Sequence, residues 1–438
     1  MGKHDKHTKT KRKSRSSSLG TIHDSFMKNM EGLDVFVAKL APVAIEHDKA
    51  EIEELRATAK RIATEIMEDE EDEGIGAKGK GKGRTATKLS PAHERELADL
   101  ADIILESMKP RLTPPQIQLL YKSSFVMLIC YFDFLVSDLV RHFYKAHPEG
   151  LPEKESSIKL SELQHCGDIS EAMDYIMDRE IDKVLYQSLD NQIKYFENTL
   201  RVDARNKTID WRIVNEAVER RNIIVHNSSK FNKRYLQSVD LSIVPEKPKD
   251  LKEDQEITLN ESYFKAVFDE VLIAGVVLTQ CCWRKWAKDD IQLADEALNA
   301  AIYDALEKEQ WQLAERLGLF SKEVKHCNEQ ARLFMHINYC QSLKWQGKED
   351  FLQKELDGLD VSTLSPVYQL AVCALKSDKK GFYRTVEKAI NVDDLTEEDF
   401  KDWPIFRERR KDRDFEKRIK AAFESASLKG KSNADSSN

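Results

Sequence analysis

One short segment of the chain places an arginine, an amide and an imidazole at spacings that suit phosphate chemistry. In the run RRNIIVHN, residues 220–227, Asn222 directly follows Arg221, and His226 comes shortly after both. A histidine can exchange a proton near neutral pH, and a guanidinium can neutralise a phosphate through paired hydrogen bonds. His226 could move the proton of a ribose 2′-hydroxyl or of a leaving 5′-oxygen, while Arg221 stabilises a pentacoordinate phosphate. The set therefore suits cleavage of RNA without a metal ion.

These residues fall on a predicted helix that begins after Asp210, a residue type favoured at helix N-caps. At roughly 100° per residue, Arg221 lies in the middle of an apolar face, and Glu219, Asn222 and His226 follow a neighbouring stripe. The predicted apolar face consists of Val214, Ala217, Val218, Ile224 and Val225. Because a buried guanidinium without partners is unfavourable, we expect Arg221 to pair with an acid or to line a cleft.

A structural interpretation of the same residues remains open. Arg221 could pair with Asp133 or Asp138 on an earlier helix, where either acid could also orient the histidine. His226 could simply occupy the end of its helix, where an imidazolium interacts favourably with the helix dipole. An arginine and a histidine at this spacing are therefore a weak signal when they are considered alone.

The other histidines and the cysteines indicate no second site. Arg141 and His147 form a similar pair, but they end a helix just before a proline, and we interpret them as structural. His165, His326 and His336 lie among helical residues without a matching Asp or Cys pattern, and we interpret them in the same way. Seven cysteines without CxxC spacing give neither a zinc pattern nor a disulfide framework. We therefore predict no metal and no cofactor.

The composition favours an all-α protein of more than one domain. The chain has 438 residues, of which 41% are apolar, with only 16 glycines and 11 prolines. The formal net charge of −8 argues against binding of nucleic acid by bulk electrostatics. Two basic segments, residues 1–15 and 406–420, could contact phosphates locally, but we interpret them as a solvated tail and a solvated helix face.

The sequence predicts a cytoplasmic location and no contact with a membrane. No apolar segment follows the basic start, so we expect no secretory signal. The most apolar run, VLIAGVVLT from Val271, is about half the length needed to cross a bilayer.

Composition and helical periodicity divide the chain into segments. We predict a disordered basic tail over residues 1–20, a helical arm over 21–70, a flexible linker over 71–95, a helical bundle over 96–290, a helical-repeat domain over 291–425 and a disordered tail over 426–438. The linker joins an acidic block to a Gly-Lys repeat, which cannot form a packed element. The repeat domain shows helix pairs at intervals of roughly 30 to 45 residues, as in a tetratricopeptide-like array. A plain helical bundle is the alternative.

The segment ERRNIIVHNSSKFNKRYL, residues 219–236, resembles the signature helix of HEPN domains. In that pattern an arginine precedes a histidine by four to six residues, a polar residue follows the arginine, an asparagine follows the histidine, and a tyrosine comes later. Those places are filled by Arg221, Asn222, His226, Asn227 and Tyr235. The long helix before the motif and the apolar helix after it also resemble this family, so the resemblance covers about residues 96 to 290.

The resemblance implies a helical bundle that pairs with a second copy and so brings two Arg/His sets into one cleft. Many members of the family are metal-independent endoribonucleases of defence or toxin systems. By this resemblance His226 would act as acid and base, Arg221 would stabilise the transition state, and Asn222 would position the substrate. Similar sequences often have glycines after the His-Asn pair, whereas this chain has Ser228 and Ser229.

Two hypotheses from different classes follow. The first is a homodimeric endoribonuclease that acts on RNA, with tRNA as one candidate, and that carries a protein regulator on its C-terminal repeats. Its supporting residues would be Glu219, Asn227, Asp138 and Asp133. The second is a non-catalytic scaffold, in which the bundle dimerises and the repeats bind a protein partner or a nucleotide.

Overall fold

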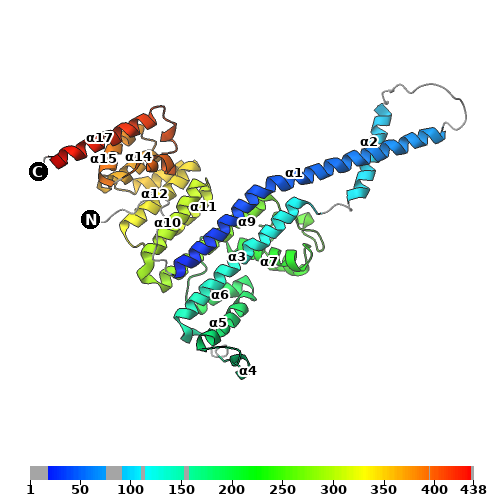
Figure 1. Cartoon of the computed structure of the whole chain (residues 1–438), viewed down its shortest axis with the longest axis horizontal. Helices are drawn as coiled ribbons and strands as arrows, with labels where there is room; N and C mark the ends of the chain where they lie inside the picture. Colours follow the sequence, from blue (N-terminus) through cyan, green and yellow to red (C-terminus); the bar gives the residue numbers. More distant parts are fainter. Residues whose placement is uncertain (1–17, 75–90, 110–113, 152–156, 394, 436–438) are drawn as a thin grey trace. The chain divides into compact units, whose positions relative to one another are not determined.

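The computed structural model describes residues 18–74, 91–109, 114–151, 157–393 and 395–435, and within these residues the fold is all-α (Figure 1). The helices are α1 Ser18–Gly74, α2 Pro91–Met108, α3 Gln116–Ala146, α4 Leu160–Leu163, α5 Ile169–Leu185, α6 Leu189–Asn198, α7 Trp211–His226, α8 Lys233–Ser238, α9 Glu261–Trp286, α10 Ile291–Glu307, α11 Trp311–Ser321, α12 Glu329–Trp345, α13 Glu349–Asp357, α14 Pro366–Leu375, α15 Lys379–Asp393, α16 Glu397–Asp402 and α17 Phe415–Asp435. The described chain forms no β-strand, and its extended backbone pairs only at an isolated bridge between Lys230 and Glu256. The predicted fold class is confirmed.

The chain forms two compact units, which are described separately. Unit 1 consists of Met1–Met27, Tyr131–Asn215 and Phe268–Asn438, and unit 2 consists of Lys28–Cys130 and Glu216–Val267. Helices α1, α3, α7 and α9 each contribute residues to both units. This division differs from the predicted boundary at residue 291, because the second part of α9 belongs to the same unit as the helices that follow it.

The predicted helical arm is one continuous helix. Helix α1 has 57 residues and contains Pro42. A proline inside a helix removes one N–H donor and usually kinks or ends the helix. Here the proline is exposed, and the helix continues beyond it.

The predicted ends of several segments lie elsewhere in the structure. Helix α1 begins at Ser18 and continues to Gly74, so it takes in the end of the predicted tail and the start of the predicted linker. Helix α17 continues to Asp435, into the segment predicted as a disordered tail. Apolar residues on its first turns, Phe415 and Ile419, are buried and anchor the helix. The rest of the first tail and of the linker, residues 1–17 and 75–90, lies outside the described residues.

The start of α1 packs closely against α9 within unit 1. A Cβ atom added to Gly275 would lie 2.3 Å from two carbon atoms of the Phe26 ring, so this approach requires a glycine. Nearby, His23 is 4% exposed, and its ring centroid lies 6.5 Å from that of Trp283. Its Nδ1 atom has no hydrogen-bond partner among the described residues. Burial therefore lowers the pKa of His23 to about 4, although the charge of Asp24 opposes this shift.

Helices α3 and α9 are long and apolar enough to cross a membrane. Their most apolar 18-residue windows have mean hydropathies of 1.7 and 1.5. In the structure, however, 50% of the α3 window and 83% of the α9 window are buried inside the protein. Burial of this kind is typical of the core helices of soluble proteins. The predicted cytoplasmic location stays a prediction.

Helices α10 to α15 form successive pairs within unit 1. Helices α10 and α11, α12 and α13, and α14 and α15 contact each other, and α12 also contacts α10 and α14. A Cβ atom on Gly318 of α11 would lie 2.8 Å from Cβ of Tyr339 on α12, so these two helices approach very closely. Helix α11 thus packs against α12 as well as α10, and the contacts run continuously along the series. The division into tetratricopeptide-like helix pairs stays a prediction.

Two arginines of the basic segment 406–420 are held by contacts within unit 1. Arg409 is 7% exposed and lies 2.9 Å from a carboxylate oxygen of Glu408. Arg410 donates a hydrogen bond of 2.8 Å to the carbonyl oxygen of Trp403. The interpretation of this segment as a solvated helix face is therefore wrong for Arg409, whose charge is held by neighbouring acids.

The buried His23 predicts a loss of stability in acid. The unfolded chain binds a proton at this position below pH 6.5, whereas the folded chain does so only near pH 4. The free energy of unfolding should therefore fall as the pH decreases through this window, by up to about 1.4 kcal/mol per pH unit. Urea unfolding at several pH values should show a smaller slope for His23→Leu than for the wild type. Equal slopes would contradict this assignment.

Candidate functional site

The arginine that lies in the core of α7 is Arg220 and not Arg221. Arg220 is 0% exposed, whereas Arg221 is half-buried. The buried face of the helix also includes Val214, Ala217 and Ile223, whereas Val225, which was predicted to lie on the apolar face, is 49% exposed. The predicted orientation of the helix is therefore wrong by about one residue, which corresponds to roughly 100° of rotation.

Arg220 is buried because carboxylates and a hydroxyl accept its N–H donors in unit 2. Its Nε atom donates to Oε1 of Glu216 at 2.6 Å, one turn earlier on the same helix. Its two terminal nitrogens donate to the two carboxylate oxygens of Glu246 at 2.7 and 2.8 Å. The hydroxyl of Tyr235, on α8, accepts a further bond of 3.1 Å. A bidentate pair of this kind is among the stronger polar interactions in proteins.

Two tyrosines complete this group, which we call the Arg220 network. The hydroxyls of Tyr235 and Tyr263 donate to the two carboxylate oxygens of Glu216. The guanidinium carbon of Arg220 lies 4.5 Å from the ring centroid of Tyr263, a cation–π contact. Burial and the charge of Glu216 raise the pKa of Tyr263 well above its ordinary value, so this tyrosine stays a donor. Although burial opposes the charge of Arg220, Glu246 and Glu216 hold its pKa well above the ordinary value.

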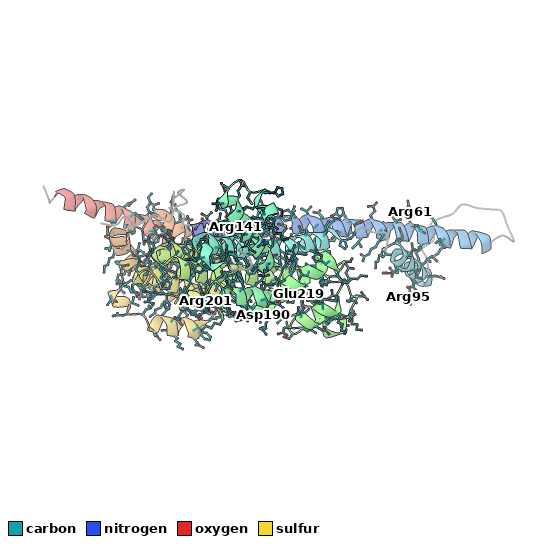
Figure 2. All side chains as sticks on the ribbon, turned by 90° about the horizontal axis from the view of Figure 1, so that it is seen from below. Arg61, Arg95, Arg141, Asp190, Arg201 and Glu219 are labelled. Carbon is teal, nitrogen blue, oxygen red and sulfur yellow. The ribbon has the colours of Figure 1, made fainter. Side chains whose placement is uncertain are left out.

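The predicted catalytic residues lie on the other side of α7. Arg221 and Asn222 are half-buried, and His226 is exposed at the end of the helix. Within the described chain no hydrogen bond or ion pair engages the His226 ring. Glu219, labelled in Figure 2, is 8% exposed, and its carboxylate lies 4.0 Å from Nε of Arg234. The imidazole of His226 is therefore exposed to solvent, whereas Glu219, on the same stripe of the helix, is buried.

The turn after His226 has an unusual backbone. Ser228 and Ser229 have φ angles of 51° and 59°, in the left-handed region that favours glycine. The side chain of Asn227 donates to the carbonyl oxygen of Lys230 at 2.7 Å, which closes the turn. Asn227 is thus engaged in this turn, and the two serines occupy backbone positions at which similar sequences have glycines.

Backbone pairing with residues 254–257 fixes the same turn. The N–H of Ile257 donates to the carbonyl of Ser229 at 2.7 Å, and the N–H of Phe231 donates to that of Gln255 at 3.0 Å. Ser229 and Phe231 are buried, as is Tyr235 of the Arg220 network. Contacts within unit 2 therefore fix the chain both before and after the predicted catalytic histidine, His226.

The two predicted supporting acids lie on the part of α3 that belongs to unit 1. Asp133 is half-buried and Asp138 is exposed. Arg221 belongs to unit 2, and its pairing with either acid stays a prediction. In the alternative Arg/His pair, Arg141 pairs with Asp178, and Nδ1 of His147 lies 3.4 Å from Glu149.

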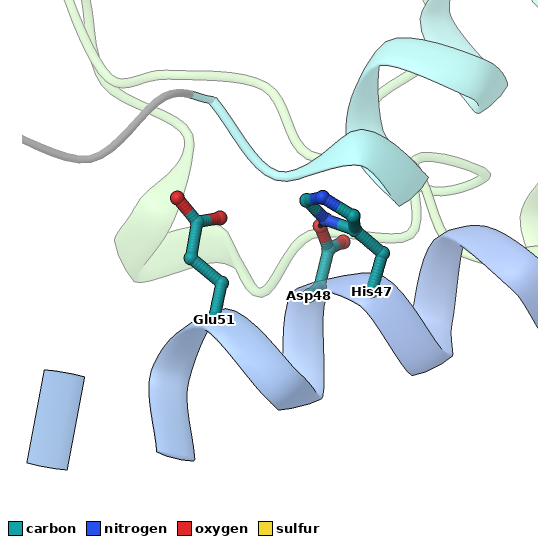
Figure 3. A group of neighbouring side chains, drawn as sticks. All are labelled: His47, Asp48 and Glu51. Carbon is teal, nitrogen blue, oxygen red and sulfur yellow. Dashed lines mark ion pairs between the residues drawn. The ribbon is translucent and has the colours of Figure 1, made fainter. Parts of the chain in front are cut away.

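One group of possible metal ligands was missed by the sequence analysis. His47, Asp48 and Glu51 project from one side of α1, and one donor atom of each lies within 4.8 Å of the others (Figure 3). The two carboxylate oxygens of Asp48, however, accept the backbone N–H groups of Gln116 and Ile117 at 2.7 and 3.0 Å. Asp48 therefore caps the N-terminus of α3, and this structural role accounts for its position. The cap joins elements distant in sequence, which the spacing of the residues does not reveal.

No protein-family model, curated protein or solved structure matches this chain. The fold and the geometry define it as an all-α protein with paired C-terminal helices. The HEPN resemblance of residues 219–236 stays a prediction.

The Arg220 network predicts unequal effects of replacing two adjacent arginines. Arg220→Ala leaves Glu216 buried and Glu246 largely buried without a countercharge, which should lower the free energy of unfolding by about 3 to 5 kcal/mol. Arg221→Ala, at a half-buried position, should cost about 1 kcal/mol or less. Urea unfolding measures both values. A larger cost for Arg221→Ala would contradict the observed orientation of α7.

The turn after α7 predicts a stabilising substitution. Ser228 is exposed and has a φ of 51°, so Ser228→Gly removes the unfavourable left-handed conformation without removing a buried contact. We expect a gain of about 0.5 to 1 kcal/mol in the free energy of unfolding. Ser228→Ala is the matched control and should give no gain, because alanine has the same restriction on φ. A lower free energy of unfolding for Ser228→Gly would contradict the prediction that the positive φ of Ser228 destabilises the protein.

Proposed function

We propose that this protein is a metal-independent endoribonuclease of HEPN type that cleaves RNA by attack of the 2′-hydroxyl on the adjacent phosphate. The observation that carries the proposal is the different environment of two adjacent arginines. Arg220 is buried in the Arg220 network. Arg221 and Asn222 are half-buried, and His226 is exposed at the end of α7. The exposed imidazole of His226 is accessible to a substrate.

Each residue has a role that follows from its chemistry. His226 takes the proton from the 2′-hydroxyl or gives one to the departing 5′-oxygen. Arg221 stabilises the additional negative charge of the pentacoordinate phosphate, which grows only in the transition state. Asn222 orients the phosphate or the imidazole through its amide. The products are a 2′,3′-cyclic phosphate and a free 5′-hydroxyl.

A second copy of the chain supplies what one copy lacks. In-line displacement needs a base at the attacking oxygen and an acid at the leaving oxygen, which lie on opposite sides of the phosphorus. One chain offers a single His226 on α7. A homodimer offers two imidazoles and two guanidinium groups in one cleft, in agreement with the resemblance. We place this activity in a defence or toxin system, with a protein regulator on the C-terminal repeats.

A non-catalytic scaffold is the second candidate. The observation in its favour is the extent of chain outside the motif: helices α10 to α17 follow α9, and α12 to α17 share one hydrophobic core. The net charge of −8 also disfavours general affinity for RNA. In this case α7 serves dimerisation, and the repeats hold a protein partner or a nucleotide.

Cleavage of RNA in excess EDTA separates the two functions. We expect the wild type to cut labelled tRNA or mixed RNA and to leave 2′,3′-cyclic phosphate ends. His226→Ala should lower the rate by about 10² to 10⁴, and Arg221→Ala by about 10² to 10³.

His147→Ala is the matched control, because it removes an exposed histidine at the end of another helix, and it should leave the rate unchanged. Thermal unfolding of each variant shows that the fold is retained. Equal cleavage by wild type and His226→Ala would assign the activity to a contaminant and would contradict the proposal. A folded wild-type dimer that cuts none of these RNAs would favour the scaffold.

A further inference from the structure

A cavity of about 360 Å³ lies within unit 1, among three consecutive helices of the repeat region. It is lined by Ser321, Lys322, Val324, His326, Arg332, His336, Lys354, Glu355, Gly358 and Leu359. These residues come from the end of α11, from the segment that follows it, from α12 and from the second half of α13. The volume falls in the lower part of the range of small-molecule sites, which begins at about 300 Å³.

The lining of the cavity is cationic although the chain as a whole is acidic. Lys322, Arg332 and Lys354 approach it from three different helical elements, and one carboxylate, that of Glu355, lies among them. Within the described chain, Lys354 is exposed and forms no ion pair. Arg332 pairs with Glu329, whose carboxylate lies outside the lining. A positive surface of this kind attracts anions.

The single acid of the cavity is already engaged. Nζ of Lys322 donates to the two carboxylate oxygens of Glu355 at 2.7 and 2.8 Å. Nε2 of His336 lies 3.7 Å from the same carboxylate. His336 is 8% exposed, and burial lowers its pKa, so at neutral pH it adds a polar but uncharged wall. The charge left over for a ligand is therefore mainly that of Lys354, because Arg332 donates to both carboxylate oxygens of Glu329.

We propose that this cavity binds the phosphate group of a small phosphorylated molecule of mononucleotide size or smaller. Lys354 holds the phosphate. Lys322 and Arg332 divide their hydrogen bonds between the phosphate and their carboxylate partners, Glu355 and Glu329. The volume suits a compact ligand better than an extended peptide. The proposal uses no residue of α7 and does not depend on the ribonuclease function.

The test is calorimetric titration of the intact protein at low salt with inorganic phosphate, adenosine monophosphate and neutral adenosine. We expect saturable binding of phosphate and adenosine monophosphate, and none of adenosine. Lys354→Ala should weaken binding roughly fivefold or more, because it removes a charge-assisted hydrogen bond. Glu355→Gln should strengthen binding, since it removes the competing carboxylate and frees Lys322.

Lys380→Ala is the matched control, because Lys380 is an exposed lysine on α15, away from the cavity residues. It should bind like the wild type. An absence of saturable binding up to about 10 mM ligand would overturn the proposal. So would equal weakening by Lys354→Ala and Lys380→Ala, which indicates unspecific attraction, or wild-type affinity in Lys354→Ala. Circular dichroism and thermal unfolding confirm that each variant is folded. Binding of an acidic peptide in place of the phosphate compounds would also overturn it.

Discussion

The buried guanidinium of Arg220 determines how α7 is oriented within unit 2. Burying such a charge is unfavourable by several kcal/mol unless nearly all of its donors are satisfied. Here the acceptors come from α7 itself, from α8 and from Glu246, and Tyr263 at the start of α9 shares the Glu216 carboxylate. Hydrogen bonds are directional, so this set of partners allows only a narrow range of rotation for the helix.

The position of the candidate catalytic residues follows from this constraint. Arg221 is the next residue along the helix and therefore points roughly 100° away from Arg220. Its side chain is half-buried, as is that of Asn222. The exposure of His226 depends on the same rotation, because the helix ends there and the following turn is fixed by backbone pairing to residues 254–257. A buried arginine thus fixes the orientation of the residue that we propose to act in catalysis.

Local sequence patterns predicted the helix but not its orientation. The N-cap residue and the apolar spacing placed a helix after Asp210, and the structure has Trp211–His226. Hydrophobic periodicity, however, treats Arg220 and Arg221 as equally polar and cannot decide which one is buried. That choice depends on Tyr235 and on Glu246 and Tyr263, which are more distant in sequence. The HEPN-like pattern includes Tyr235 but does not assign it a hydrogen-bond partner.

The turn after α7 shows a second limit of sequence reasoning. The serines at 228 and 229 were noted as a departure from glycine, and both do adopt the left-handed backbone that glycine favours. Their conformation is maintained by the bond from Ile257 to Ser229 and by the burial of Phe231. Residues 254–257 show no alternating pattern that would predict this pairing. Backbone hydrogen bonds to distant residues here outweigh the preference of serine for negative φ, and the composition of the sequence does not reveal these bonds.

The joint between α9 and α10 in unit 1 lies at the predicted boundary at residue 291. The change in composition there suggested separate domains, yet Arg284 of α9 donates to Asp295 of α10 at 2.6 Å. His326 and the N–H of Cys327 contact the same carboxylate at 3.0 and 2.7 Å. Although burial opposes it, these partners lower the pKa of Asp295 to about 2. Asp295 therefore remains ionised at neutral pH and joins α9 to α10. His326, which contacts this carboxylate, also lines the cavity, so the cavity wall and the joint share a residue.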